Sequence, residues 1–387
     1  MRNFVSSTGK YGYSDEIDSI VFSFLSVILL GCGSGRKSGE GAGEAFRIEY
    51  ARHYRVEHFR DYTLVDVLSP WDSLRLLRRY VLVDRERPLP VGLPEGNIVR
   101  TPLQRVVVYS AVHCGMLDEL GVGDRIVGVC EPRYIDLDFI RDGVARGAIA
   151  DLGEASSPDV EKVIDLAPDI IIASPFKNVG YGRIEKTAIP IMECVDYMEV
   201  TPLGRAEWMR FMALFFDRGQ RADSLFRQTA AAYDSLCRMT DTVGVRPTVL
   251  SEKKYGSAWY VPGGRSYIAN LYRDAGADYI WADDPTTGSV PLAFETVFEK
   301  GQGADFWLIK YNAPQELTYA ELQTEYEPYR HFDAFKNRNI FVCNTGETPY
   351  YEEMPMHPDR VLGDLIEIFH PGTIPGYRLR YFNRMRQ

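Results

Sequence analysis

Short apolar segments alternate with helical segments from Arg105 almost to the end of the chain. The segments at 105–110, 125–130, 169–174 and 189–194 are centred on apolar residues, as are those at 248–253, 277–282, 305–310 and 339–344. An uninterrupted apolar centre is typical of a strand buried on both faces, and strands alternating with helices indicate a mainly parallel sheet. The alternation stops near residue 200 and restarts after Pro247. The sequence therefore predicts two α/β lobes.

The longest helical pattern in the chain lies between the two sets of strands. Over residues 220–239 the apolar side chains recur on one face, at Ala222, Leu225, Phe226, Ala230, Tyr233, Leu236 and Cys237. This is the spacing of an amphipathic helix, and about twenty residues at 1.5 Å each span roughly 30 Å. We therefore expect residues 201–240 to link a first lobe at 105–200 to a second lobe at 244–370.

A similar order of residues occurs once in each lobe. Glu161 precedes an apolar segment that opens with Asp169, and Glu295 precedes one that opens with Asp305. Ser157 is expected to cap the first of these helices, and the second helix is expected over 291–300. The repetition predicts two lobes of like construction, with a final helix at 359–370.

The regions outside the two predicted lobes do not show the alternation of strands and helices. Residues 46–104 contain short strand-like segments at 46–51, 62–67 and 79–84, and the prolines at 88, 90 and 94 break the chain before the first lobe. We expect this region to be a β-rich N-terminal elaboration of the first lobe. The tail at 371–387 is basic and is broken by proline and glycine.

The N-terminal residues have the pattern of a targeting segment. Residues 19–31 form an apolar run that is too short for an ordinary membrane span, which needs about 20 residues, but has the length of a signal-peptide core. The run ends in Leu-Leu-Gly-Cys at 29–32, which resembles the lipobox of bacterial lipoproteins. The resemblance implies a signal peptide at 1–31, a lipid on Cys32 and a flexible tether at 32–45. Asp15, Glu16 and Asp18 depart from the basic start of an ordinary signal peptide.

Charge and motif content exclude several functions. The net charge of −10 argues against a nucleic-acid partner, which needs a basic surface. The chain has no G-x-S-x-G, no H-E-x-x-H and no phosphate-binding loop between a strand and a helix, so we expect neither an enzyme nor a bound cofactor. Five cysteines remain besides Cys32, an odd number, so at least one is expected to be free.

The segments at 105–110, 120–129, 157–174 and 295–309, together with the long helix, resemble the helical-backbone class of periplasmic binding proteins. Those proteins serve ABC importers of ferric siderophores, haem and cobalamin. The resemblance covers about 105–371 and implies two Rossmann-like lobes with mainly parallel sheets joined by one backbone helix. It implies a monomeric substrate-binding protein on the periplasmic face of a bacterial membrane, held there only by its lipid, with a permease dimer as partner.

The resemblance also assigns roles to residues. It implies that Glu161 and Glu295, one on each lobe, dock on the permease. A ligand is expected between the lobes, beyond the ends of the strands. Aromatic rings suit a flat macrocycle, and arginines suit an anionic chelate. The candidates are His113, Arg133, Tyr134, Phe176 and Tyr197 in the first lobe, and Tyr255, Trp259, Tyr260, Arg265, Tyr311, Tyr350 and Tyr351 in the second.

The identity of the ligand stays open among several chelates. A ferric siderophore is favoured, and cobalamin and haem are alternatives for the same architecture. A free metal ion is less favoured, because the six histidines show no metal-binding spacing. A glycan-binding lipoprotein would also use exposed aromatic residues, but the α/β repeat argues against it.

Overall fold

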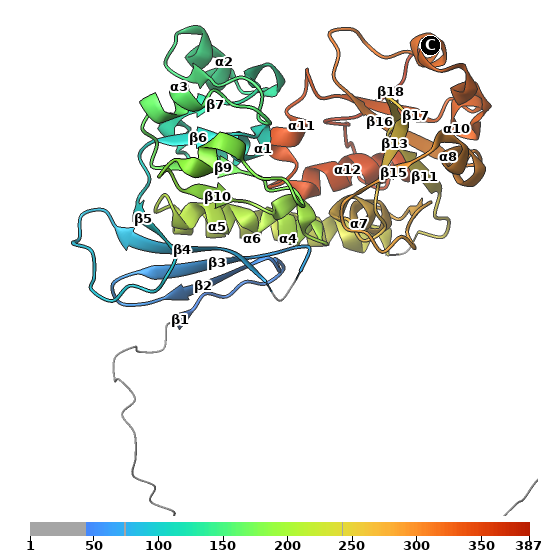
Figure 1. The fold of residues 1–387 in the computed structure, drawn as a ribbon. Coiled ribbons are helices and arrows are strands. Elements are labelled where there is room, and N and C mark those ends of the chain that lie inside the picture. The colour runs from blue at the N-terminus through green and yellow to red at the C-terminus, as the bar shows by residue number, and fades with distance from the viewer. Residues whose placement is uncertain (1–43, 73–74, 242) are drawn as a thin grey trace, which may run out of the picture. The chain divides into compact units, whose positions relative to one another are not determined.

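The computed structural model describes residues 44–387 except 73, 74 and 242 (Figure 1). Residues 42–387 form one compact unit. The signal peptide predicted at 1–31, the proposed lipid site Cys32 and nearly all of the tether lie outside the described residues. Within the part of the chain that the structure describes, no helix is both long and apolar enough to cross a membrane.

The first lobe contains a parallel five-stranded sheet in the order β10-β9-β6-β7-β8. Val106 and Val108 of β6 enter one hydrophobic core, whereas Val107 enters another on the opposite face. The strand is therefore buried on both sides, as its apolar run predicts. The strands are β6 (Val106–Val108), β7 (Ile126–Val129), β8 (Ala150–Asp151), β9 (Ile170–Ala173) and β10 (Ile191–Glu193). The helices are α1 (Ala111–Glu119), α2 (Asp138–Ala145) and α3 (Val160–Asp165).

The second lobe repeats this construction in the order β14-β11-β16-β17-β18, parallel except for the last strand. The strands are β11 (Thr248–Ser251), β14 (Asp278–Tyr279), β16 (Phe306–Tyr311), β17 (Ile340–Asn344) and β18 (Asn383–Arg384). The helices are α7 (Tyr267–Asp274), α8 (Phe294–Gly301), α9 (Tyr319–Glu325), α10 (Asp333–Lys336), α11 (Tyr350–Glu353) and α12 (Pro358–Phe369). The mixed α/β fold with mainly parallel sheets is thus confirmed.

Two helix starts differ from the sequence-based expectation. The first is at α3, where Asp159, not Ser157, is the N-cap and accepts a hydrogen bond from the Lys162 N–H. At α8 the helix begins at Phe294, because residues 289–292 form β15. This strand belongs to a small antiparallel sheet made of β12 (Lys254–Tyr255), β13 (Ala258–Pro262) and β15 (Ser289–Leu292).

The N-terminal region forms a separate five-stranded sheet in the order β1-β2-β3-β4-β5. Its strands are β1 (Glu44–Ala45), β2 (Tyr54–His58), β3 (Thr63–Leu68), β4 (Leu76–Asp84) and β5 (Asn97–Thr101). The prediction of a strand at 46–51 was wrong, because these residues form a loop. Glu207 is fully buried and accepts hydrogen bonds from three successive backbone N–H groups, those of residues 49–51. Those donors are therefore not available to a neighbouring strand.

The N-terminal sheet packs against the first lobe through aromatic rings. The ring of Tyr54 lies 5.1 Å from that of Trp208, and the ring of Tyr80 lies 5.5 Å from that of Phe215. Trp208 belongs to α5 (Trp208–Leu214), which follows α4 (Pro202–Ala206). Thr201 caps α4 by accepting a hydrogen bond from the Gly204 N–H.

One long helix contributes to the cores of both lobes. This is α6 (Gly219–Thr240), which has 22 residues and so measures about 33 Å. Phe226 near its start lies in the core of the first lobe, and Tyr233 two turns later lies in the core of the second. The hydroxyl of Tyr233 donates a hydrogen bond to Asp274 over 2.7 Å.

Candidate functional site

The loops that follow the parallel strands of the two lobes converge where α1 meets α11. Helix α1 follows β6, α11 follows β17, and the two helices pack directly on each other (Figure 1). A side chain at Gly115 in α1 would collide with the backbone of Glu352 in α11. Ligands of α/β sheets bind beyond the carboxyl ends of strands, so the candidate site is at this junction of α1 and α11.

Two pairs of candidate residues in the first lobe come together. The guanidinium of Arg133 lies 4.5 Å from the ring of Tyr134, and it also pairs with Glu154 at 2.8 Å. The ring of Phe176 lies 5.8 Å from the ring of Tyr197. Tyr134 and Phe176 are 48% and 60% exposed, so both rings can meet a ligand.

The other first-lobe candidate, His113, is completely buried. Its Nε2 lies 3.4 Å from Asp196, whose other carboxylate oxygen accepts a hydrogen bond from Arg205 over 3.0 Å. Burial alone would raise the pKa of Asp196, but Arg205 and His113 together hold it below its ordinary value. The guanidinium of Arg205 lies 4.4 Å from the ring of Tyr267, which belongs to the second lobe. His113 is thus part of a buried polar cluster that joins the lobes.

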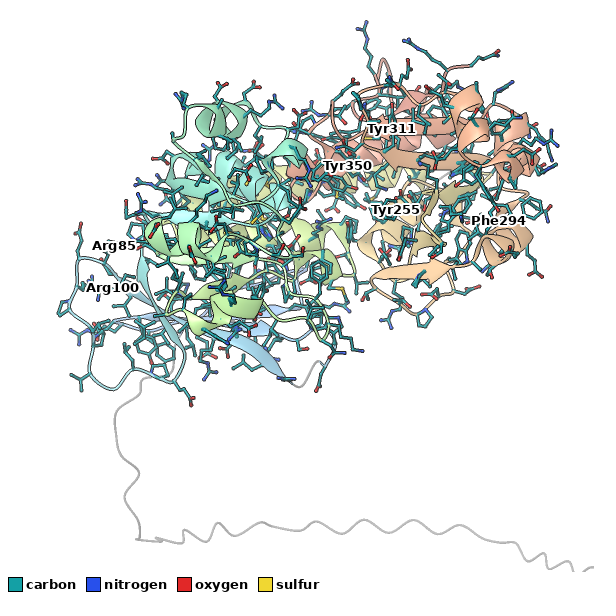
Figure 2. The ribbon with its side chains drawn as sticks, turned by 45° about the horizontal axis from the view of Figure 1, so that its top comes forward. Arg85, Arg100, Tyr255, Phe294, Tyr311 and Tyr350 are labelled. Carbon is teal, nitrogen blue, oxygen red and sulfur yellow. The ribbon has the colours of Figure 1, made fainter. Side chains whose placement is uncertain are left out.

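In the second lobe the exposed candidates are Tyr255, Tyr260, Tyr351 and Arg265. Tyr255 is the most open of the rings, at 82% exposure. Figure 2 shows Tyr255 and Tyr350 on the side of the second lobe that faces the first. Tyr311 is half-buried, and its hydroxyl accepts a hydrogen bond from the Leu317 N–H over 3.2 Å.

Two second-lobe candidates lie inside the protein. Trp259 is fully buried and packs 5.6 Å from both Trp307 and Tyr329, while its indole N–H donates to the Ser251 carbonyl. The ring of Tyr350 is 2% exposed and lies 5.4 Å from the ring of Tyr351. Trp259 therefore belongs to an aromatic core, and Tyr350 supports its exposed neighbour.

Sequence reasoning missed an ion pair beside Tyr350. Lys310 at the end of β16 bonds to Glu252, which follows the neighbouring strand β11 and has a left-handed backbone with φ of 65°. Burial would lower the pKa of Lys310, but Glu252 and nearby tyrosines hold it well above its ordinary value. The Lys310 ammonium lies 5.8 Å from the ring of Tyr350. The signal in the sequence was a charged residue at the end of one buried strand and another directly after the strand beside it.

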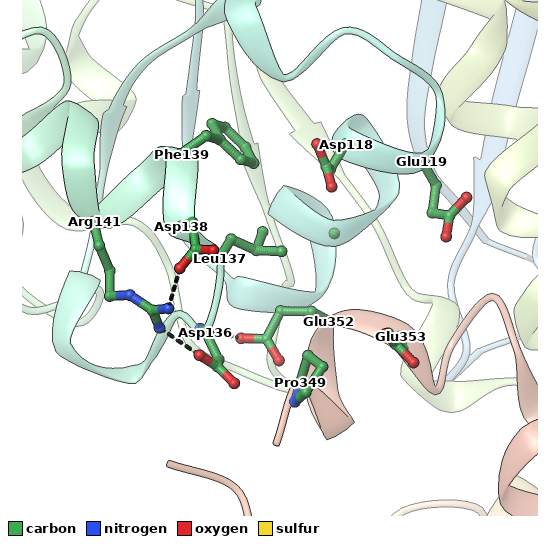
Figure 3. Close-up of a pocket in the computed structure, with 11 residues that line it drawn as sticks. Asp118, Glu119, Asp136, Leu137, Asp138, Phe139, Arg141, Pro349, Glu352 and Glu353 are labelled. Carbon is green, nitrogen blue, oxygen red and sulfur yellow. Dashed lines mark hydrogen bonds and ion pairs between the residues drawn. The ribbon is translucent and has the colours of Figure 1, made fainter. Parts of the chain in front are cut away.

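A cavity of about 530 Å³ lies between α1, α2 and α11 (Figure 3). Six carboxylates line it, with one arginine, Arg141, which pairs with Asp136 and Asp138. Burial raises the pKa of both Asp118 and Glu352. So much negative charge disfavours an anionic ligand there. The other lining residues are Gly115, Glu119, Leu137, Phe139, Pro349 and Glu353.

The two proposed docking residues occupy equivalent places. Glu161 is the second residue of α3 and Glu295 is the second residue of α8, and both are exposed. Each helix directly precedes a central strand of its lobe's parallel sheet, β9 and β16. An acid in the first turn also interacts favourably with the helix dipole.

The cysteines of the described residues are free thiols. They are Cys114, Cys130, Cys194, Cys237 and Cys343, and all but Cys237 are buried. In the same part of the chain, no three His, Cys, Asp or Glu side chains are grouped so that they could hold a metal ion.

Several curated proteins are similar to this chain over most of its length. An uncharacterised lipoprotein of Methanocaldococcus jannaschii is 26% identical over 79% of this chain and 75% of its own length. A cobalamin-binding protein of Halobacterium salinarum is 24% identical over 75% of this chain and 77% of its own length. A petrobactin-binding protein of Bacillus subtilis is 34% identical, but over only 27% of this chain and 33% of its own length.

The fold is also found among solved structures. The molybdate-bound periplasmic binding protein of Haemophilus influenzae superposes with a TM-score of 0.58 at 16% identity, covering 73% of this chain and 90% of that one. The family model described as periplasmic binding protein matches residues 106–345, which span the parallel strands of both lobes and α6. With sequence family and fold in agreement, this chain belongs to the periplasmic binding protein family.

Proposed function

We propose that this chain is the substrate-binding component of an ABC importer and that it captures a metal chelate between its two lobes. The observation that carries the proposal is the junction of α1 and α11, which brings the carboxyl ends of two parallel sheets to face each other. Exposed rings follow strands of both parallel sheets, at Tyr134 and Phe176 in the first lobe and at Tyr255 and Tyr351 in the second. Such rings suit a large ligand with flat surfaces.

A ferric siderophore remains the favoured ligand. The petrobactin-binding relative supports this choice, because petrobactin is a siderophore. Arg133 and Arg265 are both exposed and offer guanidinium groups to an anionic chelate. The carboxylate-lined cavity touches the same α1–α11 junction, so an anionic chelate would bind toward Arg133 and Arg265 and not inside that cavity.

Cobalamin is the second candidate, because the cobalamin-binding relative is similar over three quarters of this chain. A titration of residues 42–387 with a ferric siderophore panel, cobalamin and haem, followed by tryptophan fluorescence, separates the candidates. Saturable binding of one class identifies the ligand. If none binds, the chelate proposal fails, and only the family and the fold remain.

Delivery is proposed to follow docking of Glu161 and Glu295 on the permease. A carboxylate on each lobe would align the protein on a two-fold partner and set the rate of encounter more than the affinity for ligand. Replacing both by alanine is expected to abolish uptake and to keep ligand affinity unchanged. A loss of ligand affinity in E161A/E295A would contradict the assignment.

We further propose that a lipid on Cys32 holds the protein at the periplasmic face of the membrane. The similar proteins of Methanocaldococcus jannaschii are lipoproteins by name, which supports this part of the proposal. Metabolic labelling with a radioactive fatty acid tests it directly, with Cys32→Ser as the variant that should lose the label.

A further inference from the structure

The loop that joins β4 to β5, residues 85–96, exposes an apolar tip. Seven successive residues from Pro88 to Pro94 carry no charge and only one, Gly92, lacks an apolar side chain. Leu89 is 53% exposed and Val91 is completely exposed. Ile98 at the start of β5 is 46% exposed. Exposed aliphatic side chains that gather in one loop, unlike singly scattered ones, make that loop a candidate binding surface.

Hydrogen bonds fix the start of this 85–96 loop on the N-terminal sheet, and its end runs directly into β5, which pairs with β4. The guanidinium of Arg100 donates to the carbonyls of Arg85 and Arg87, and the N–H of Arg85 donates to the Thr101 carbonyl over 2.7 Å. Arg85 also pairs with Asp169 of the first lobe at 2.8 Å. Three prolines restrict the backbone of the tip itself. The apolar residues are therefore presented on a stiff and well-anchored support.

The N-terminal region that carries the loop has a small excess of positive charge in an otherwise acidic protein. Residues 46–105 contain eleven arginines against eight aspartates and glutamates, although the whole chain has a net charge of −10. Arg87, at the edge of the tip, is 62% exposed and lies 3.5 Å from Asp84. Within the loop Arg85 and Arg87 are balanced by Glu86 and Glu95, so the excess of positive charge belongs to the rest of the N-terminal region. An apolar tip on a basic support is the composition that favours the interface of an anionic bilayer.

Covalent geometry keeps this sheet near the proposed lipid anchor. Glu44 in β1 is twelve residue steps from Cys32, so the chain between them can extend no further than about 40 Å. Strands β1 and β5 are the two edges of one sheet, and four strand spacings measure roughly 19 Å. A lipid on Cys32 would therefore bring the 85–96 loop within reach of the same membrane.

We propose that the 85–96 loop is a second membrane contact, which inserts Leu89 and Val91 into the interface of an anionic lipid bilayer. The proposal uses the anchor of the proposed function but concerns different residues. Figure 1 shows α3, which carries Glu161, on the side of the first lobe away from the N-terminal sheet. The membrane-bound pose would thus differ from the pose docked on the permease.

The test uses residues 42–387, which form one compact unit and lack the proposed lipid site. Cosedimentation would compare vesicles of phosphatidylcholine alone with vesicles that also contain phosphatidylglycerol. We expect binding to the anionic vesicles and weakening by salt. The substitution L89S/V91S should weaken binding roughly tenfold, because two aliphatic side chains no longer enter the bilayer.

The control is I164S/V245S, which alters two exposed aliphatic residues, 50% and 78% exposed, outside the loop and outside the candidate ligand site. It should bind vesicles as the parent does, and both variants should keep the parent's melting temperature and ligand affinity. Equal vesicle binding by the parent and L89S/V91S would overturn the proposal, as would no binding to any vesicle. Loss of permease binding without loss of vesicle binding would identify the loop as a protein contact instead. None of these outcomes bears on labelling of Cys32 or on ligand capture.

Discussion

The two lobes both place charged groups near the carboxyl ends of their strands, but they bury them to different degrees. In the first lobe, Asp196 and Arg205 have side chains that are 2% and 6% exposed. In the second lobe, Lys310 and Glu252 keep 15% and 21% of their side chains exposed. The first pair is closed off from solvent and contacts Tyr267 of the other lobe. Burial therefore distinguishes a closed structural junction from a pair that solvent still reaches.

The largest expected effect on stability comes from breaking the buried pair of Asp196 and Arg205. Replacing Arg205 by methionine removes the partner of a carboxylate that is hardly exposed, which is expected to lower the unfolding free energy by about 3–5 kcal/mol. Urea denaturation followed by circular dichroism measures this. The double variant D196N/R205M should recover part of the loss, because no buried charge remains. Lys336→Met, in the exposed pair with Asp333, should change stability by only about 0–1 kcal/mol.

The first lobe holds a second buried carboxylate, which should make its stability depend on pH. Burial raises the pKa of Glu199 to about 7, although Trp208 and the N–H groups of Arg52 and His53 donate to it. Between the ordinary pKa of 4.5 and about 7 the folded protein binds more protons than the unfolded chain. Its contribution to stability is thus present below pH 4.5 and is lost as pH rises through 7.

Glu199→Gln should therefore reduce the fall in unfolding free energy between pH 5 and pH 8 by about 2–3 kcal/mol. Urea titrations at several pH values would measure the difference. The exposed Glu299→Gln serves as the control and should reproduce the parent's pH dependence. An unchanged slope in Glu199→Gln would mean that Glu199 is ionised throughout this range.

The pair in the second lobe should have a smaller effect on stability. Lys310→Met leaves the Glu252 carboxylate partly exposed and without its ammonium partner, at an expected cost of about 1–3 kcal/mol. Lys253→Met, whose partner Glu325 is 39% exposed, should cost less, about 0–1 kcal/mol. A loss for Lys310→Met as large as that for Arg205→Met would remove the distinction between the lobes.

The difference between buried and exposed positions also explains which features could be predicted from the sequence. The parallel strands were predictable because both faces of each are apolar, and α6 because its stripe has helical spacing. The burial of Trp259 and His113 was not, since a ring suits a core as well as a binding surface. The 46–51 loop depends on carboxylates about 150 residues away, at Glu199 and Glu207. Only the folded chain brings such partners together.

The smallest expected effect on stability, and the sharpest test of the ligand site, comes from the exposed rings. Phe176→Ala and Tyr255→Ala remove rings that are 60% and 82% exposed, one from each lobe, so the unfolding free energy should change by less than about 0.5 kcal/mol. If both lobes hold the ligand, each variant should weaken binding by roughly tenfold, the order of one aromatic contact. Val245→Ala, at an exposed position that is not a candidate ligand residue in either lobe, should leave the affinity for ligand unchanged. A loss in only one variant would place the ligand on a single lobe. Unchanged affinity in both would remove these rings from the site, whereas a loss of stability would show that they support the fold.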